Sequence, residues 1–239
     1  MEIKVADYII NHLSNIGVDN VFVVYGAANG NLIDAFTRND KIEYVATMHE
    51  QGGGFAAEGY AKVSKNIGVA IATSGPGGMN LVTSAGNCFY DSVPCLFMTG
   101  QIKTKYMRPD KSIRQIGFQE ADMVGVFKSV TKYSKLVENP EDIRYELEKA
   151  IYIAKSGRPG PVHLDLPIDV QKALIDPEKL LGFDEHLANT SYNLDSVNKQ
   201  IDKFLEDLKN SKRPCLMIGG GVRLANAEKD ILELAELLK

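Results

Sequence analysis

His49-Glu50-Gln51-Gly52-Gly53-Gly54 is the stretch of this chain on which the fold prediction depends. The residues before it, 42–47, include apolar β-branched and aromatic side chains, so we predict a buried strand there. The residues after it, 55–62, are typical of a helix. A carboxylate, Glu50, is therefore expected where a strand passes into a helix, beside glycines that let a flat ligand approach the backbone closely.

The next predicted strand, 68–73, runs directly into the glycine-rich sequence Ser74-Gly75-Pro76-Gly77-Gly78-Met79-Asn80. Two successive strands thus deliver a carboxylate and a glycine-rich turn to one edge of a sheet. In open parallel sheets, ligands bind beyond the carboxyl ends of the strands. We therefore expect a binding site at this edge.

Strands, turns and helices alternate along most of the chain. The predicted elements are helices over 5–16, 32–38 and 140–156, and strands over 21–24, 94–99, 130–137 and 162–167. This alternation is typical of parallel βαβ units. The predicted fold class is therefore α/β, with a mostly parallel sheet and helices on both faces.

We predict three parts in the chain: an α/β domain over 1–170, a linker over 171–194, and the beginning of a second α/β domain over 195–239. The linker is predicted because hydrophobic periodicity is lost there. The elements expected in the last part are a helix over 197–208, a strand over 214–218 and a helix over 225–238. Such a unit cannot bury both faces of a sheet, so we expect a piece of a longer chain.

Composition limits the classes of partner. The net charge is −4 and no basic excess is present, which argues against nucleic acid or an anionic membrane as the main partner. No apolar stretch reaches the length of a membrane span, and the N-terminus lacks a signal-peptide pattern, so we expect a cytoplasmic protein. Cys88, Cys95 and Cys215 lack metal-ligand spacing and are predicted to fill a reduced core.

Position alone leaves the role of Glu50 open. A carboxylate among Gly, Ala and Phe would be poorly hydrated and suited to sharing a proton, but a carboxylate at this place could equally cap the following helix. The neighbouring His49 is interpreted as a structural residue. The basic loop Lys103–Gln115 is interpreted either as a solvated surface segment or as a loop through which substrate reaches the site, with equal weight.

The glycine-rich turn 74–80 could bind an anion, because such turns precede helices in phosphate sites. It is not a dinucleotide fingerprint, since Asn80 stands where the third glycine is required, and it lacks the lysine of a P-loop.

Several motifs, taken in order, resemble the pyrimidine-binding domain of thiamine-diphosphate enzymes of the acetolactate synthase-like group. They are His49-Glu50-Gln51, Ala57-Glu58-Gly59-Tyr60-Ala61, Ala72 to Gly77 with Asn80, Asp91-Ser92-Val93-Pro94, Thr99-Gly100-Gln101 and Gly117-Phe118-Gln119-Glu120. They span most of residues 1–170. The family usually has proline at Tyr25 and glycine at Ala27, and a shorter segment at Lys103–Gln115. Because this turn and loop shape the entrance of the pocket in the family, the resemblance does not fix the acceptor substrate.

The resemblance implies roles for particular residues. Glu50 matches the glutamate that hydrogen-bonds ring nitrogen N1′ of the cofactor, and it is expected to be catalytic together with Gln119. Phe118 and Gln119 are expected to face the substrate. The residues expected to bind the cofactor are Tyr25, Gly26, Ala27, Glu50, Thr73, Pro76, Gly77 and Asn80.

The resemblance also implies cofactors and partners. Thiamine diphosphate is the expected cofactor, with Mg²⁺ and the diphosphate held by a separate domain bearing a Gly-Asp-Gly motif; this chain has no Gly-Asp pair, so no metal ligand is expected in it. FAD binding stays open. The site is shared between subunits in this family, which implies a homodimer or homotetramer. The face near Tyr60, Met79 and Phe89 is expected to be exposed in this chain and to self-associate.

The implied activity is decarboxylation of a pyruvate-like 2-oxo acid and ligation of the product to a carbonyl acceptor, a lyase and transferase chemistry. This chain alone is expected to be inactive. The alternatives are another thiamine-diphosphate decarboxylase or oxidase, a specialised relative in sugar metabolism, or a non-catalytic module for binding or assembly.

Overall fold

The structure is a computed structural model that describes residues 1–110, 112–188 and 193–238. The chain divides into two compact units, Met1–Ala188 and Asn189–Lys239. The first unit carries all the residues that sequence analysis assigned to the site.

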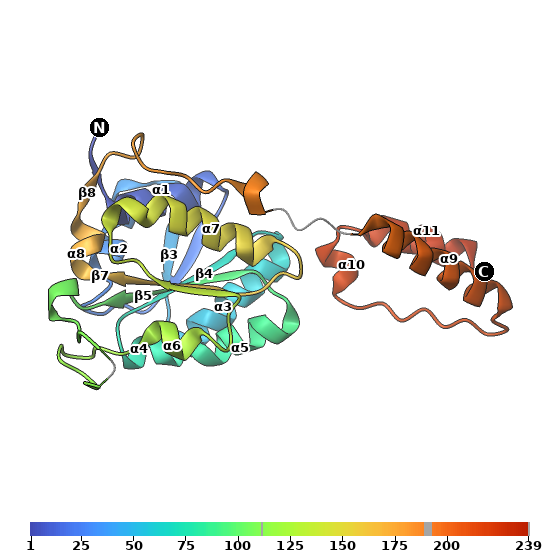
Figure 1. Cartoon of the computed structure of the whole chain (residues 1–239), viewed down its shortest axis with the longest axis horizontal. Helices are drawn as coiled ribbons and strands as arrows, with labels where there is room; N and C mark the ends of the chain where they lie inside the picture. Colours follow the sequence, from blue (N-terminus) through green and yellow to red (C-terminus); the bar gives the residue numbers. More distant parts are fainter. Residues whose placement is uncertain (111, 189–192, 239) are drawn as a thin grey trace. The chain divides into compact units, whose positions relative to one another are not determined.

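A six-stranded sheet forms the centre of the first unit (Figure 1). Its strands are β2 (Asn20–Val23), β3 (Glu43–Ala46), β4 (Gly68–Ala72), β5 (Cys95–Gln101), β6 (Tyr133–Leu136) and β7 (Val162–Pro167). The strands lie in the order β3-β2-β4-β5-β7-β6, and every pairing in this sheet is parallel. The predicted α/β class with a parallel sheet is confirmed.

Helices cover both faces of this sheet (Figure 1). On one face lie α1 (Val5–Asn15), α2 (Gly30–Ala35) and α7 (Ile143–Lys155). On the other lie α3 (Glu50–Ser64), α4 (Pro76–Asn80), α5 (Val82–Asp91) and α6 (Met123–Phe127). The short 3₁₀ turns are η1 (Phe36–Arg38), η2 (Thr104–Tyr106) and η3 (Pro140–Asp142).

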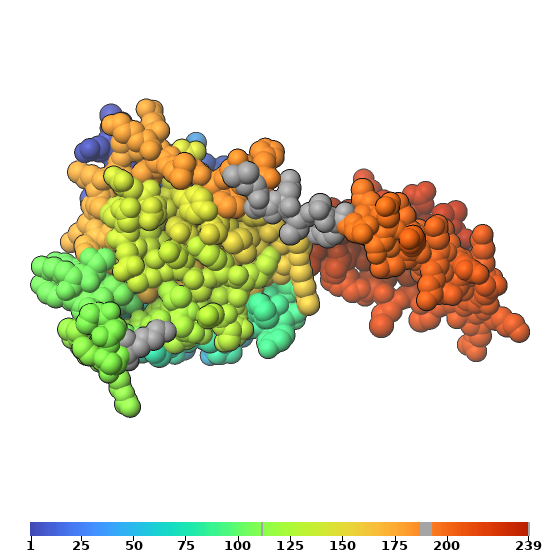
Figure 2. Space-filling view, in the orientation of Figure 1, coloured from blue at the N-terminus to red at the C-terminus, as the bar shows by residue number. Residues whose placement is uncertain are grey.

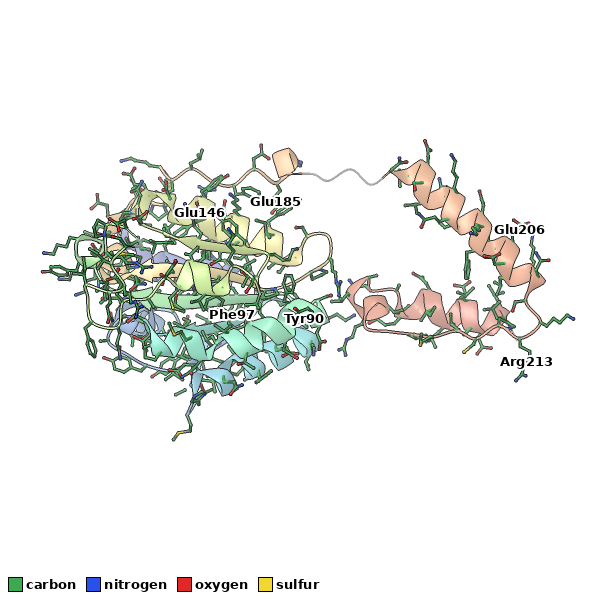
Figure 3. The ribbon with its side chains drawn as sticks, turned by 60° about the horizontal axis from the view of Figure 1, so that its bottom comes forward. Tyr90, Phe97, Glu146, Glu185, Glu206 and Arg213 are labelled. Carbon is green, nitrogen blue, oxygen red and sulfur yellow. The ribbon has the colours of Figure 1, made fainter. Side chains whose placement is uncertain are left out.

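Each strand divides its side chains between two cores, as the period of two along a strand requires. Val69 and Ile71 of β4 pack with α1 and α7, whereas Ala70 and Ala72 pack with α3 and α5. Phe97 of β5 belongs to the second core and lies between the sheet and its helices (Figure 3). Helices therefore shield both faces of the central strands from water.

The strand before Glu50 differs from our expectation. We predicted a buried strand over 42–47, but every residue of β3 is exposed. Tyr44 and Val45 retain 46% and 40% of their accessible surface. The reason is position, because β3 is an edge strand with β2 as its only neighbour in the sheet.

Much of the segment assigned to a linker packs on the first unit. After β7 the chain forms α8 (Ile168–Lys172) and β8 (Leu174–Ile175), and β8 pairs antiparallel with β1 (Ile3–Lys4). Ile175 and Leu180 are buried, so hydrophobic packing holds this stretch against the first unit. It ends in η4 (Glu185–Ala188). Residues 189–192 of the expected linker lie outside the described residues.

The second unit contains α9 (Leu194–Asn210), α10 (Gly221–Leu224) and α11 (Glu228–Leu237). The strand predicted over 214–218 is wrong, because that segment has no strand partner in the described part of this unit. Cys215 within it is exposed, against the core role expected. Cys88 and Cys95 are buried, and their sulfur atoms lie 3.6 Å apart. Across the described residues, none of the helices is both long and apolar enough to cross a membrane.

A buried polar network joins β5 and β7. The Thr99 hydroxyl donates to Asp165 Oδ1 (2.6 Å) and contacts His163 Nε2 (2.8 Å), while Gln101 Nε2 donates to Asp165 Oδ2 (3.0 Å). Burial raises the pKa of Asp165 to about 7 and lowers the pKa of His163 to about 3. Both side chains are therefore favoured in their neutral forms inside the fold.

These two shifts act in opposite directions on the pH dependence of stability. Folded Asp165 keeps a proton that the unfolded chain loses above its ordinary pKa, so its contribution to stability falls as pH rises toward 7. The unfolded chain protonates His163 below its ordinary pKa and the folded chain does not, so that contribution falls as pH drops. Between about pH 4 and 6.5 the two contributions offset each other.

We predict that Asp165→Asn will expose the histidine contribution. The free energy of unfolding of the variant should rise from pH 4.5 to 6.5 by about 1–3 kcal/mol relative to wild type, because one proton changes stability by about 1.4 kcal/mol per pH unit. Urea unfolding at several pH values measures this. The exposed Asp40→Asn is the control, and a variant curve parallel to wild type would contradict the prediction.

Candidate active site

The site lies where the order of the strands reverses. The chain passes from β2 outward to β3, then returns past β2 to form β4 on its other side. The turns that follow β2 and β4 therefore leave neighbouring strands at the same edge. Such a switch point is where open α/β sheets bind ligands.

The first turn of α3 presents Glu50. His49 is the N-cap residue, and its Nδ1 accepts a hydrogen bond from the Gln51 backbone amide at 3.2 Å. His49 thus has a structural role, because it caps the N-terminus of α3. The helix begins at Glu50 rather than at Phe55, so the three glycines lie inside it. Because His49 supplies the cap, Glu50 has its carboxylate available for other contacts.

Asn80, at the end of α4, holds the Glu50 carboxylate. Its Nδ2 donates to Glu50 Oε2 at 2.9 Å. Oε1 accepts no hydrogen bond from the part of the chain that the structure describes. Glu50 is half-buried at the edge of the sheet. The two residues come from different strand–helix junctions, so their contact joins the motif 49–54 to the motif 74–80.

Glycines let two turns pack closely beside this carboxylate. A Cβ on Gly77 would lie 3.1 Å from Glu50 Oε1 and 2.7 Å from Thr73 Cγ2. A Cβ on Gly26 would lie 2.5 Å from Thr73 Cβ. Any larger residue would collide with Thr73, so both turns pack against it as bare backbone. Glu50, Gly26, Thr73 and Gly77 therefore form one connected surface.

The turn after β2 is held by side chains as well as by packing. The Ala28 amide donates to Thr73 Oγ1 at 3.2 Å. Asn29 is fully buried; its Oδ1 accepts from the Gly26 amide (2.8 Å) and its Nδ2 donates to the Val24 carbonyl (2.9 Å). Sequence analysis missed Asn29. An asparagine that follows a strand and a glycine was the available signal, since its side chain stabilises such turns.

The predicted cofactor residues at the outer part of the site are exposed. Tyr25 retains 73% of its accessible surface, and Ala27 and Pro76 are exposed too. Pro76 begins α4, where a missing amide hydrogen costs nothing.

Gln119 reaches the same edge from a distant part of the chain. Both Gln119 and Gly75 have a φ of +58°, and a Cβ on Gly75 would lie 2.6 Å from the Gln119 carbonyl oxygen. Gln119 thus packs directly on the glycine-rich turn. The adjacent Phe118 is 84% exposed, so it is not a buried loop anchor. Gln119 therefore lies beside the turn that contains Gly77, and Phe118 is its exposed neighbour in the chain.

The loop Lys103–Gln115 is largely exposed, and it stands out from the first unit in the space-filling view, where it is green (Figure 2). Lys111 lies outside the described residues. The buried Glu120 organises the return of this loop, because its carboxylate accepts from the amides of Arg108 (2.7 Å), Ile116 (2.8 Å) and Gly117 (3.2 Å). The loop is therefore fixed at its base and exposed at its tip.

The geometry agrees with a comparison against known protein families. The family "Thiamine pyrophosphate enzyme, N-terminal TPP binding domain" matches residues 3–126. The chain belongs to this family. The match covers the turns at Gly26, Glu50 and Thr73 as well as Gln119, so the resemblance seen in the motifs is confirmed.

Several relatives of the chain carry acetolactate synthase names. A probable acetolactate synthase large subunit of Methanocaldococcus jannaschii is 38% identical over 99% of this chain and 39% of its own length. The acetolactate synthase large subunit of Corynebacterium glutamicum is 38% identical, over 97% of this chain and 36% of its own length. The chloroplastic acetolactate synthase of Arabidopsis thaliana is 40% identical, over 91% and 32%. The chain thus spans about a third of the length of these relatives.

In this member of the thiamine pyrophosphate enzymes, the described residues contain no group of three or more His, Cys, Asp or Glu side chains placed to hold a metal ion. The arrangement offers one half-buried carboxylate, held by an amide, next to a turn that carries no side chain at Gly77. It can therefore hydrogen-bond a heterocycle that approaches edge-on and exchange a proton with it.

The close packing of α3 predicts the effect of a single methyl group. A Cβ on Gly54 would lie 1.9 Å from Ser84 Oγ and 2.7 Å from Ser84 Cβ, and Ser84 is fully buried. We expect Gly54→Ala to lower the free energy of unfolding by about 1–3 kcal/mol. Gly59→Ala in the same helix is the control: nothing lies within 4 Å of its Cβ, so it should be neutral or stabilising by up to about 1 kcal/mol. Urea unfolding measures both, and equal effects would refute this account.

Proposed function

We propose that this chain binds the aminopyrimidine end of thiamine diphosphate and that Glu50 is its catalytic carboxylate. The protein to which the chain belongs would decarboxylate a pyruvate-like 2-oxo acid and join the product to a carbonyl acceptor, as an acetolactate synthase-like enzyme. The observation that carries the proposal is the position of Glu50, held by Asn80 beside the Cβ-free backbone of Gly77.

The residues present fit this cofactor. A flat ring must reach the Glu50 carboxylate, and a side chain on Gly77 would project toward Glu50 Oε1, so the bare backbone of Gly77 keeps that oxygen clear. A ring nitrogen needs a carboxyl partner, and Glu50 Oε1 faces Gly77 while Asn80 occupies Oε2. Asn80 thereby fixes which oxygen Glu50 offers to the ring.

Glu50 acts on the proton of the ring nitrogen in this proposal. Its carboxyl shares that proton and sets the protonation of the ring, a form of general acid–base catalysis. Thiamine diphosphate, when bound, supplies a carbon nucleophile and an acceptor for the electrons that decarboxylation releases. Tyr25, Ala27 and Pro76 border the ring, and Phe118 and Gln119 face the substrate.

The remaining parts of the enzyme lie outside this chain in our proposal. The diphosphate and its Mg²⁺ are assigned to a domain of a partner subunit, so that the complete site needs a homodimer or homotetramer. The length of the relatives supports this, since they extend well beyond the region that the chain matches. By itself the chain is then inactive.

A second candidate function is the same chemistry with another acceptor substrate. It is supported by exposed side chains beside the site. Tyr25, Ala27 and Phe118 are all exposed, and the exposed loop after β5 leads directly to Phe118. Because the first two depart from the residues usual in the family, a specialised carbonyl acceptor such as a sugar derivative is compatible with them.

We predict that Glu50→Gln will lower kcat at least 100-fold in the enzyme that joins this chain to its diphosphate-binding part, because the amide cannot exchange a proton with the ring. Steady-state assays with pyruvate, thiamine diphosphate and Mg²⁺ measure this. Glu43→Gln, on the exposed edge strand, is the matched control and should keep full activity. Normal turnover by Glu50→Gln would show that the assignment is wrong.

We also predict that the chain self-associates through the face that carries the site. Of the residues expected on this face, Met79 retains 46% of its surface, whereas Tyr60 and Phe89 are half-buried. Met48 and Phe55, which flank Glu50 in the sequence, are exposed as well. Sedimentation at micromolar concentration should show species larger than a monomer, and Met79→Lys should weaken the association. The control is Met217→Lys, which changes an exposed methionine of the second unit. A strictly monomeric wild type would count against this interface.

A further inference from the structure

Helix α8 contains a fully buried polar side chain. Gln171 has no accessible surface, although it lies in a stretch that the sequence pattern assigns to a linker. Burying an amide is costly unless its polar atoms are paired. The partners of Gln171 therefore indicate what holds it there.

Gln171 bridges the last parallel strand to the turn after β2. Its Nε2 donates two hydrogen bonds of 2.7 Å, one to the Leu166 carbonyl in β7 and one to the Ala28 carbonyl. Its Oε1 is buried and has no partner among the described residues. The two donated hydrogen bonds are therefore what stabilises the buried position of the Gln171 side chain, because burial of the unpaired Oε1 atom is unfavourable.

The Ala28 carbonyl is confined on its other side by β5. A Cβ on Gly100 would lie 2.1 Å from the Ala28 oxygen and 2.4 Å from its carbon. The peptide after Ala28 therefore lies against bare backbone on one side and receives a hydrogen bond from Gln171 on the other. With the Ala28 amide bonded to Thr73, both polar atoms of this residue are engaged.

Helix α8 is itself tied to the body of the unit. The Asp169 carboxylate accepts from the Thr104 amide (3.1 Å) and the Thr104 hydroxyl (2.6 Å), at the start of the loop after β5. The strand that follows α8 pairs with the N-terminal strand β1. Gln171 thus extends from a fixed support rather than from a free segment.

We propose that Gln171 is a positioning residue for the cofactor: by holding the Ala28 carbonyl it sets the place of Gly26 and Ala27 relative to Glu50. The role as a cofactor positioner rests on the proposed function. The hydrogen bond and its effect on the turn do not, so the two can be tested separately.

Hydrogen exchange in the 239-residue chain tests the effect on the turn. Gln171→Leu removes both donated bonds and keeps a similar volume. The amides of Gly26 and Ala28, which bond to Asn29 and Thr73, should then exchange at least tenfold faster than in wild type, after correction for any change in global stability. Unchanged rates at these two amides would overturn the proposal.

Asn66→Leu is the matched control. Asn66 Nδ2 also donates to a distant backbone carbonyl, that of Ile16 (3.0 Å), but it precedes β4 and so lies at the opposite edge of the sheet. Its loss should leave the Gly26 and Ala28 amides at wild-type rates. Faster exchange in this variant to the same extent would mean that any lost buried bond loosens the turn, and would overturn the specific role.

Gln171→Glu keeps the test available if the leucine variant does not fold. The new carboxyl group could donate one bond to Ala28 when it is protonated, whereas its ionised form could donate none. Exchange at Gly26 and Ala28, relative to wild type at the same pH, should therefore be fast at pH 8 and approach wild type at pH 5. A ratio independent of pH would overturn the proposal.

The cofactor role needs the enzyme that includes the diphosphate-binding part. The KM for thiamine diphosphate should be about tenfold higher in Gln171→Leu than in Asn66→Leu, measured at a temperature at which both variants are folded. An unchanged KM with a loosened turn would overturn the positioning role. A wild-type enzyme that does not respond to thiamine diphosphate would instead refute the proposed function, while the exchange results would still decide whether Gln171 holds the turn.

Discussion

The packing of Thr73 against two glycines is the constraint on which the rest of the site depends. Its hydroxyl accepts from Ala28, and its carbon atoms lie where Gly26 and Gly77 would otherwise carry a Cβ. The turns after β2 and β4 can meet around this one side chain only because each presents bare backbone to it. The position of Gly77 in turn sets the distance to the Glu50 carboxylate.

Small residues extend this close packing beneath α3. Ala57, Ala70, Ala72 and Ala85 line the core on that face of the sheet, and the Gly54 backbone approaches Ser84. Gly68 likewise lies against the Ala57 carbonyl, which a Cβ there would reach at 2.0 Å. The helix that carries Glu50 is consequently held near the sheet by backbone proximity, which leaves little freedom for its first turn.

The parts of the structure that local sequence patterns encode could be predicted, and the parts set by distant neighbours could not. Periodicity identified the parallel strands, and the motifs identified Glu50, Thr73 and Gln119 as neighbours of one edge. The exposure of β3 depends on its place in the strand order, which no local pattern contains. Gln171 and Asn29 act through carbonyls and amides of other segments, and their residue types alone carry no sign of those partners.

The pairing of β8 with β1 has a consequence for biosynthesis. Ile3 pairs with Ile175, so β1 is synthesised long before its partner strand exists. The contact of Gln171 with Ala28 is delayed in the same way. Domains of nascent chains fold as units during synthesis. A nascent chain that has not yet reached residue 171 would therefore lack one of the hydrogen bonds that hold the turn after β2, whereas the bonds from Asn29 and Thr73 could already form.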